Sequence, residues 1–243
     1  MDIKTTMIRP DKLIVGPPRS GTTWLRRQLL NNKIAAIPGN QLGELNFYGF
    51  RAFDYSRLEG INEIDEIVDF TPIYLTHQPS FEDILTHQKI LEIKTLAIIR
   101  DPVERFVSDF FHKFSKHEQK DYRIFEATAI DKYLSDPQVI QSSTDWYSPG
   151  KLLSHSFWSA NLKEIEKSSS HLTLPFKLMV HRPEIFMRHV TDHFRLPLCN
   201  ELDTAPVNSS VRTLVSQPSD DLSALLRAER KIVDELDKLF DVV

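Results

Sequence analysis

The chain has 243 residues, of which 41% are hydrophobic and 26% charged, as is ordinary for a folded globular protein. Its net charge of −4 argues against nucleic acid as the main partner, so an anionic ligand has to be held by local cations. The single cysteine, Cys199, excludes an internal disulfide and fits a reducing compartment. No apolar run approaches the ~18 residues of a membrane span, and residues 1–10 lack the apolar core of a signal peptide. We therefore expect a cytoplasmic protein.

The predicted elements alternate between strands and helices along the chain. Short apolar runs predict buried strands at 12–16, 34–38, 67–70, 94–99 and 176–180. Apolar residues at helical spacing predict helices at 21–31, 79–87, 152–167, 184–194 and 222–240, the last with Ser219 as its cap, and a further helix begins after residue 100. This alternation predicts an α/β fold with a mostly parallel sheet and helices on both faces. Since no Pro/Gly-rich linker divides the chain, we expect a single domain over residues 1–243.

A glycine-bounded loop follows the first predicted strand. It reads Gly16-Pro17-Pro18-Arg19-Ser20-Gly21-Thr22-Thr23, with the G-x-x-x-x-G frame and the strand–loop–helix context of a phosphate-binding loop. The Lys-Ser/Thr pair of ATPases is replaced by two threonines, and the nearest cation, Arg19, lies inside the loop. Backbone N–H groups and a helix N-terminus are expected to cradle an anionic ester here, and ATP hydrolysis is not the first expectation.

A second anion motif follows the predicted strand 94–99. Asp101 suits the N-cap of the next helix, and Pro102 suits its first position. Ser108 comes seven residues after Asp101, or two helical turns, so it lies on nearly the same face of the helix. Arg100 and a serine hydroxyl displayed together can bind a second phosphate. Because ligands of parallel sheets sit at the carboxyl ends of the strands, the two motifs predict a ligand with two separated anionic groups.

Together these residues resemble the 3′-phosphoadenosine 5′-phosphosulfate (PAPS)-dependent sulfotransferases. Residues 18–25 resemble the 5′-phosphosulfate loop of that family, and residues 98–110 resemble its 3′-phosphate motif, in which the arginine and the serine hold the phosphate. The resemblance covers residues 12–115 and implies a three-layer, P-loop-like fold. It also implies a cofactor site made of Arg19, Ser20, Gly21, Thr22, Thr23, Trp24, Arg100 and Ser108.

Two further segments resemble the heparan-sulfate-type members of the family. Residues 43–48 are similar to their Lys-Glu-x-x-Phe-Phe segment, which implies that Glu44 is the catalytic base. Residues 68–74 resemble their Glu-Lys-Thr-Pro-x-Tyr segment, although Phe70 stands where those enzymes place lysine. No late Lys-Gly-Arg segment is evident, and Arg212 is the only nearby basic residue to replace it as a cofactor ligand.

The chemistry that the resemblance implies is transfer of a sulfuryl group to a hydroxyl of a carbohydrate, glycolipid or small-molecule acceptor. Arg19 and the N–H groups near residues 21–23 are placed to meet charge on the leaving phosphate, so Arg19 is also expected to be catalytic. Glu44 would accept the proton of the acceptor. No metal is needed for this chemistry. Three histidines are rival bases: His77, His112 and His117.

Two other functions fit parts of the sequence. A P-loop nucleotide kinase or NTPase would use Asp69, at the end of a predicted strand, for Mg²⁺, but the missing lysine at position 22 counts against it. A catalytically inactive nucleotide-binding protein is the second alternative. Retention of both Arg19 and Glu44 argues against it.

Overall fold

Within the described residues, four parallel strands form the sheet at the centre of the molecule. The computed structural model describes residues 10–34, 48, 66–91, 93–118, 153–199, 201–203 and 220–242. The strands are β1 (Lys12–Ile14), β2 (Val68–Asp69), β3 (Lys94–Ile99) and β4 (His171–Pro175). Their order is β2-β1-β3-β4, so the chain builds the sheet outward from β1 in both directions. The switch point of the topology therefore falls between β1 and β3, where ligands of such sheets bind.

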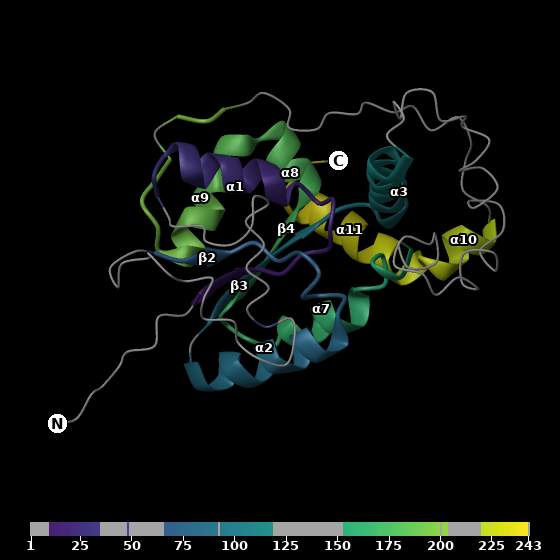
Figure 1. Cartoon of the computed structure of the whole chain (residues 1–243), viewed down its shortest axis with the longest axis horizontal. Helices are drawn as coiled ribbons and strands as arrows, with labels where there is room; N and C mark the ends of the chain where they lie inside the picture. Colours follow the sequence, from purple (N-terminus) through teal and green to yellow (C-terminus); the bar gives the residue numbers. More distant parts are fainter. Residues whose placement is uncertain are drawn as a thin grey trace.

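Helices cover both faces of this sheet (Figure 1). Leu13 and Val15 of the β1 segment point into one apolar cluster and Ile14 into the other, because successive strand residues alternate between faces. The first cluster includes residues of α2 (Gln78–Leu91), α7 (Ser159–Ile165) and α11 (Arg227–Leu239). The second includes residues of α1 (Thr22–Asn31), α8 (Phe176–His181) and α9 (Pro183–Phe194). The predicted α/β fold with a parallel sheet between helical layers is confirmed.

The turn from β3 into helix α3 (Pro102–Glu118) follows the sequence prediction closely. One carboxylate oxygen of Asp101, Oδ1, accepts hydrogen bonds from the backbone N–H groups of Val103 and Glu104, each at 2.9 Å. Asp101 is therefore the N-cap of α3, and it supplies acceptors to N–H groups that the helix itself leaves unpaired. This cap fixes the direction in which α3 leaves the carboxyl end of the sheet.

The strand predicted at 176–180 is wrong, because these residues form helix α8. The strand lies immediately before it, as β4, and its last residue, Pro175, pairs with Ile99 and occupies the N-cap position of α8. Four of the five residues at 176–180 are apolar, and so short an apolar segment fits a buried strand and a buried helix turn equally well. The sequence analysis missed β4 because its residues His171 and Thr173 are polar and interrupt the apolar run.

Two predicted helices are shorter than their apolar patterns. Within the predicted helix at 152–167, residues 153 and 154 are helical, residues 155–158 are not, and α7 begins after the fully buried Trp158. The C-terminal stripe is split into α10 (Asp220–Leu225) and α11, with the fully buried Leu226 between them. Apolar spacing continues across both breaks because each contains a fully buried apolar residue, Trp158 or Leu226. The predicted cap Ser219 and most of the predicted strand 34–38 lie outside the described residues.

None of the helices within the described ranges combines the length and the hydropathy needed to cross a membrane.

Candidate active site

The backbone conformation of the loop that follows β1 favours glycine at two positions, 16 and 21. A Cβ atom on Gly16 would lie 2.7 Å from the backbone nitrogen of Ile98, so the loop can pass this close to β3 only with glycine there. The φ angles of Arg19 and Gly21 are both positive, 68° and 89°. Glycine adopts such a left-handed backbone conformation without steric cost, which explains the glycine at position 21. The loop is thus folded tightly against the switch point between β1 and β3.

The loop ends at the N-terminus of α1 in an arrangement that fits a bound anion. Gly21 is the N-cap of α1, none of the described side chains caps the helix, and no acidic residue stands in its first turn. The hydroxyl of Ser20 is fully buried and has no hydrogen-bond partner within the part of the chain that the structure describes. A buried hydroxyl of this kind costs free energy unless a ligand or water pairs with it. Together with the partial positive charge of a helix N-terminus, it suits an oxygen of a phosphate.

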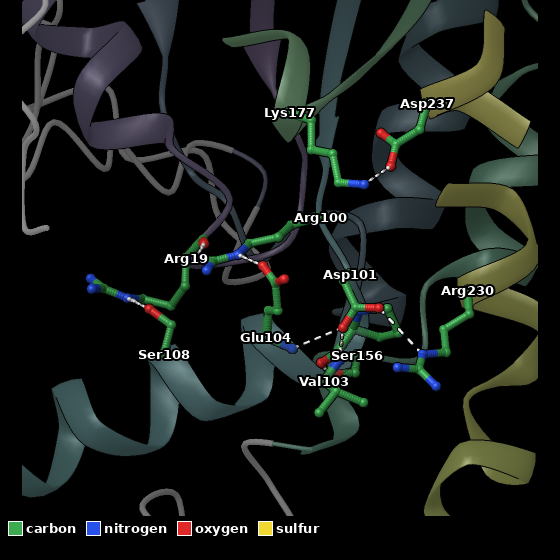
Figure 2. Close-up of polar contacts among 11 residues, drawn as sticks. Arg19, Arg100, Asp101, Val103, Glu104, Ser108, Ser156, Lys177, Arg230 and Asp237 are labelled. Atoms are coloured by element: carbon green, nitrogen blue, oxygen red, sulfur yellow. Dashed lines mark hydrogen bonds and ion pairs between the residues drawn. The ribbon is translucent and has the colours of Figure 1, made fainter. Parts of the chain in front are cut away.

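Arg19, Arg100 and Ser108 come together from three separate segments (Figure 2). The Nε of Arg19 lies 3.4 Å from the Oγ of Ser108, and the Nη1 of Arg100 lies 3.4 Å from the carbonyl oxygen of Arg19. Burial lowers the pKa of the Arg19 guanidinium; the Asp109 carboxylate raises it, and the neighbouring Arg100 lowers it again. The effect of Arg100 on the Arg19 pKa indicates that the two cations repel each other, and an anion bound by both would relieve that repulsion.

Arg100 is held by three different groups. Its guanidinium carbon lies 4.6 Å from the centre of the Phe176 ring, at the start of α8. Its Nε lies 3.2 Å from a carboxylate oxygen of Glu104, one helical turn further along the chain. With the carbonyl contact to Arg19, these interactions reduce the freedom of a long side chain before any ligand arrives. Phe176 was not predicted as a site residue, because the sequence analysis placed it in a strand.

A buried ion pair lies behind Ser108 on α3. Arg105 is fully buried, and its Nη1 lies 3.1 Å from the Oδ2 of Asp109. Its Nε donates to the Oγ of Ser156 at 2.9 Å, and Ser156 donates in turn to the carbonyl oxygen of Pro102. Sequence reasoning did not single out this pair, although its i,i+4 spacing on a predicted helix was a visible signal. The pair fixes α3, and with it Ser108, against the segment that precedes α7.

Asp69 lies at the carboxyl end of β2, on the opposite side of β1 from β3. It is fully buried, and its two oxygens accept hydrogen bonds from the Thr71 hydroxyl and the Tyr74 hydroxyl, each at 2.6 Å. Burial, and then the Asp69 charge, raise the pKa of Tyr74 well above its ordinary value. Because both carboxylate oxygens are already hydrogen-bonded, the arrangement favours a structural carboxylate over the magnesium ligand of an NTPase.

Trp24 and the two threonines occupy different surroundings. The indole of Trp24 is buried, packs edge-to-face on Phe186 of α9 and donates from Nε1 to the carbonyl oxygen of Asp203. It holds α1 against α9 and against the segment at Asp203, and its predicted contact with the cofactor stays a prediction. Thr22 is partly exposed and Thr23 exposed, at the first two positions of α1, where their N–H groups point out of the helix end.

The structure describes only some of the residues predicted as candidates for the general base. A ring nitrogen of His77, Nδ1, lies 2.7 Å from the hydroxyl of Ser80, and His112 is half-buried on α3. His117 belongs to the last turn of α3, and its side chain is outside the described set. Glu44 and Arg212 also lie outside the described residues, so their predicted roles stay predictions.

The sequence matches the family model described as "Sulfotransferase domain" over residues 9–202. The chain therefore belongs to the sulfotransferase family, and both anion motifs fall inside the matched range. The resemblance read from the two motifs is thereby confirmed at the level of the family. A comparison with curated protein sequences returns no match.

Solved structures support the same fold. The crystal structure of a sulfotransferase from Alicyclobacillus acidocaldarius is 19% identical, with a TM-score of 0.63, and the similarity covers 97% of each chain. A sulfotransferase domain from the curacin biosynthetic pathway is 12% identical, with a TM-score of 0.50, covering 97% of this chain and 99% of that one. At these identities the likeness shows the arrangement of the sheet and helices, while the chemistry has to be argued from the site itself.

Proposed function

We propose that this sulfotransferase uses PAPS as its sulfuryl donor and transfers the group to a hydroxyl of a carbohydrate, glycolipid or small molecule. The observation that carries the proposal is the meeting of Arg19, Arg100 and Ser108 beside the buried Ser20 hydroxyl, which has no hydrogen-bond partner among the described residues. These groups come from the carboxyl ends of β1 and β3, which flank the switch point of the sheet. They offer two adjacent anion-binding positions, as a nucleotide with phosphates at both its 3′ and 5′ positions requires.

The residues divide between the two ends of this nucleotide. The Ser20 hydroxyl and the N–H groups of Gly21, Thr22 and Thr23 suit the 5′ end, where the helix N-terminus of α1 favours negative charge. Arg100 and Ser108 suit the 3′-phosphate, and Arg19 lies between the two sets. When bound, PAPS supplies a sulfuryl group whose bond to the 5′-phosphate oxygen breaks as a bond to the acceptor oxygen forms.

Arg19 has the position needed to stabilise charge on the leaving phosphate. Its guanidinium is partly desolvated, and burial strengthens its interaction with a developing negative charge. An Arg19→Ala variant should therefore lose turnover more strongly than it loses nucleotide affinity.

Glu44 is proposed as the general base on the resemblance of its segment. Tyr48, four residues later in the chain, is buried, and its N–H donates to the Tyr74 hydroxyl at 3.1 Å. The residue after Tyr74, Leu75, donates from its N–H to the carbonyl oxygen of Val15, just before the anion loop. The described end of the Glu44 segment, Tyr48, is thus connected through Tyr74 to a part of the chain that hydrogen-bonds to the residue before the anion loop.

The acceptor is proposed only by its reacting group, a hydroxyl, which Glu44 would deprotonate as sulfur bonds to its oxygen. A screen of sulfuryl transfer from labelled PAPS onto sugars, glycolipids and simple alcohols would define the class. Transfer to none of these by the folded protein, together with tight nucleotide binding, would favour an inactive nucleotide-binding protein.

Thermal denaturation with two ligands separates the proposal from a nucleotide kinase or NTPase. Adenosine 3′,5′-bisphosphate at about 100 times its Kd should raise the free energy of unfolding by about 2.7 kcal/mol. Mg·ATP should give little stabilisation, because the loop lacks the lysine that reaches the β- and γ-phosphates. Stabilisation by Mg·ATP alone would overturn the proposal.

A further inference from the structure

Helix α11 makes two ion pairs that end beside the proposed 3′-phosphate site (Figure 2). One joins Arg230 to Asp101, and the other joins Asp237 to Lys177. Asp101 directly follows Arg100 in the chain, and Lys177 directly follows Phe176, the ring that packs against Arg100. Residues 227–239 of α11 lie beyond the range 9–202 that matches the family model, so the family match assigns them no role.

The first ion pair acts on the start of α3. The Nε of Arg230 lies 3.3 Å from the Oδ2 of Asp101, while the Oδ1 of Asp101 accepts the two N–H groups at the N-cap of α3. One carboxylate therefore connects α11 with the cap of the helix that carries Ser108. A carboxylate held from both sides has fewer accessible rotamers, so the turn that presents Arg100 is better defined.

The second ion pair acts on the start of α8. Asp237 is 3% exposed; its Oδ2 lies 2.8 Å from the Nζ of Lys177, and within the described residues its Oδ1 has no hydrogen-bond partner. A buried carboxylate with one oxygen unpaired depends on its cation, because an isolated buried charge is costly. The hydrogen bond that Lys177 donates to Asp237 raises the pKa of Lys177, so the lysine stays charged. Asp237 thereby fixes Lys177 and, next to it, the Phe176 ring under Arg100.

We propose that Arg230 and Asp237 of α11 are positioning residues that set the affinity of this protein for the 3′-phosphate of its nucleotide. They touch neither the nucleotide nor the reacting atoms, and they act through the two neighbours of Arg100. The inference rests on the proposed function, because it assigns the 3′-phosphate to Arg100 and Ser108.

The test compares two nucleotides that differ only in the 3′-phosphate. The Kd values of adenosine 3′,5′-bisphosphate and of adenosine 5′-monophosphate are measured by calorimetry for the full chain and its variants. Arg230→Ala and Asp237→Asn should each raise the Kd of the bisphosphate by about 3- to 30-fold, the range in which residues without ligand contact change coupling. The Kd of the monophosphate should change less than about twofold, since its single phosphate binds at the loop after β1.

Matched variants distinguish positioning from general damage. Arg182→Ala removes another ion pair, with Asp241, which is more exposed and, among the described residues, involves neither Asp101 nor Lys177, so both Kd values should stay unchanged. Arg230→Lys should recover most of the bisphosphate affinity, because it keeps a cation near Asp101. If Arg230→Ala does not fold, the test relies on Asp237→Asn, because asparagine has nearly the same shape as aspartate and lacks only its charge.

A double-mutant cycle with Arg100→Ala decides through which residue α11 acts. In the Arg100→Ala background, Arg230→Ala should no longer affect the Kd of the bisphosphate. An equal loss for both nucleotides, or a loss that persists without Arg100, would overturn the inference. If Arg100→Ala itself leaves the preference for the bisphosphate intact, the proposed site is wrong, and this inference fails with it.

Discussion

The buried ion pair of Arg105 and Asp109 allows a prediction whose magnitude follows from the structure. Arg105 is fully buried, Asp109 is 1% exposed, and the two side chains lie 3.1 Å apart on successive turns of α3. Replacing Asp109 by alanine leaves the guanidinium buried without its carboxylate. Removing one partner of a buried pair costs about 3–5 kcal/mol. For a chain of this size each 1 kcal/mol lowers Tm by roughly 2–4 °C, so Asp109→Ala should lower Tm by roughly 6–20 °C.

The assay is urea denaturation followed by circular dichroism, with Tm from calorimetry as a second readout. The double variant Arg105→Met/Asp109→Leu removes both charges and fills the space, so it should be more stable than Asp109→Ala alone. Lys167→Ala removes a surface partner of Glu164 and should change stability by less than about 1 kcal/mol. The reasoning is refuted if Asp109→Ala is no more destabilising than Lys167→Ala, or if the double variant is the least stable of the three.

Three further predictions concern other parts of the molecule. Gly16→Ala should lower the free energy of unfolding, measured by urea denaturation, by about 1–3 kcal/mol, because the added Cβ would lie 2.7 Å from the Ile98 nitrogen. A decrease of less than about 0.5 kcal/mol would contradict the described conformation of the loop. Burial lowers the pKa of His171 to about 3, so this histidine stays neutral in the folded protein. The free energy of unfolding is therefore at its full value above pH 6.5 and falls by about 1.4 kcal/mol per pH unit below that, because the unfolded chain binds a proton that the folded chain does not. His171→Gln should flatten the fall in stability between pH 7 and pH 5, and an unchanged slope would remove His171 from this account. Glu44→Gln should keep nucleotide affinity and lower turnover by at least about a hundredfold in a labelled-sulfate assay, whereas near-normal turnover would transfer the role of base to a histidine, with His77 first.

The parts of the fold that sequence reasoning predicted are those specified by local chemistry. Residues 96–99 are continuously apolar, and the Asp-Pro pair that follows satisfies the first turn of a helix, so strand and helix were both found. The loop after β1 was found because its two glycines bound a short segment between an apolar strand and a helix. In each case the responsible residues are neighbours in the chain.

The parts that were missed depend on residues distant in sequence. Phe176 became a site residue because β4 pairs with β3 and brings its carboxyl end beside Arg100. Arg230 approaches Asp101 across 129 residues, and no periodicity of α11 signals that contact. The full burial of Arg105 could likewise not be inferred, since arginine is rarely buried unless it is paired.

The central claim is that the loop after β1 and the Arg100–Ser108 pair bind the two phosphates of one nucleotide. A crystal structure of the protein with adenosine 3′,5′-bisphosphate tests it most directly. The account predicts the 5′-phosphate within hydrogen-bonding distance of Ser20 and the first N–H groups of α1, and the 3′-phosphate in contact with Arg100 and Ser108. A nucleotide bound elsewhere, or one whose 3′-phosphate contacts neither Arg100 nor Ser108, would contradict it.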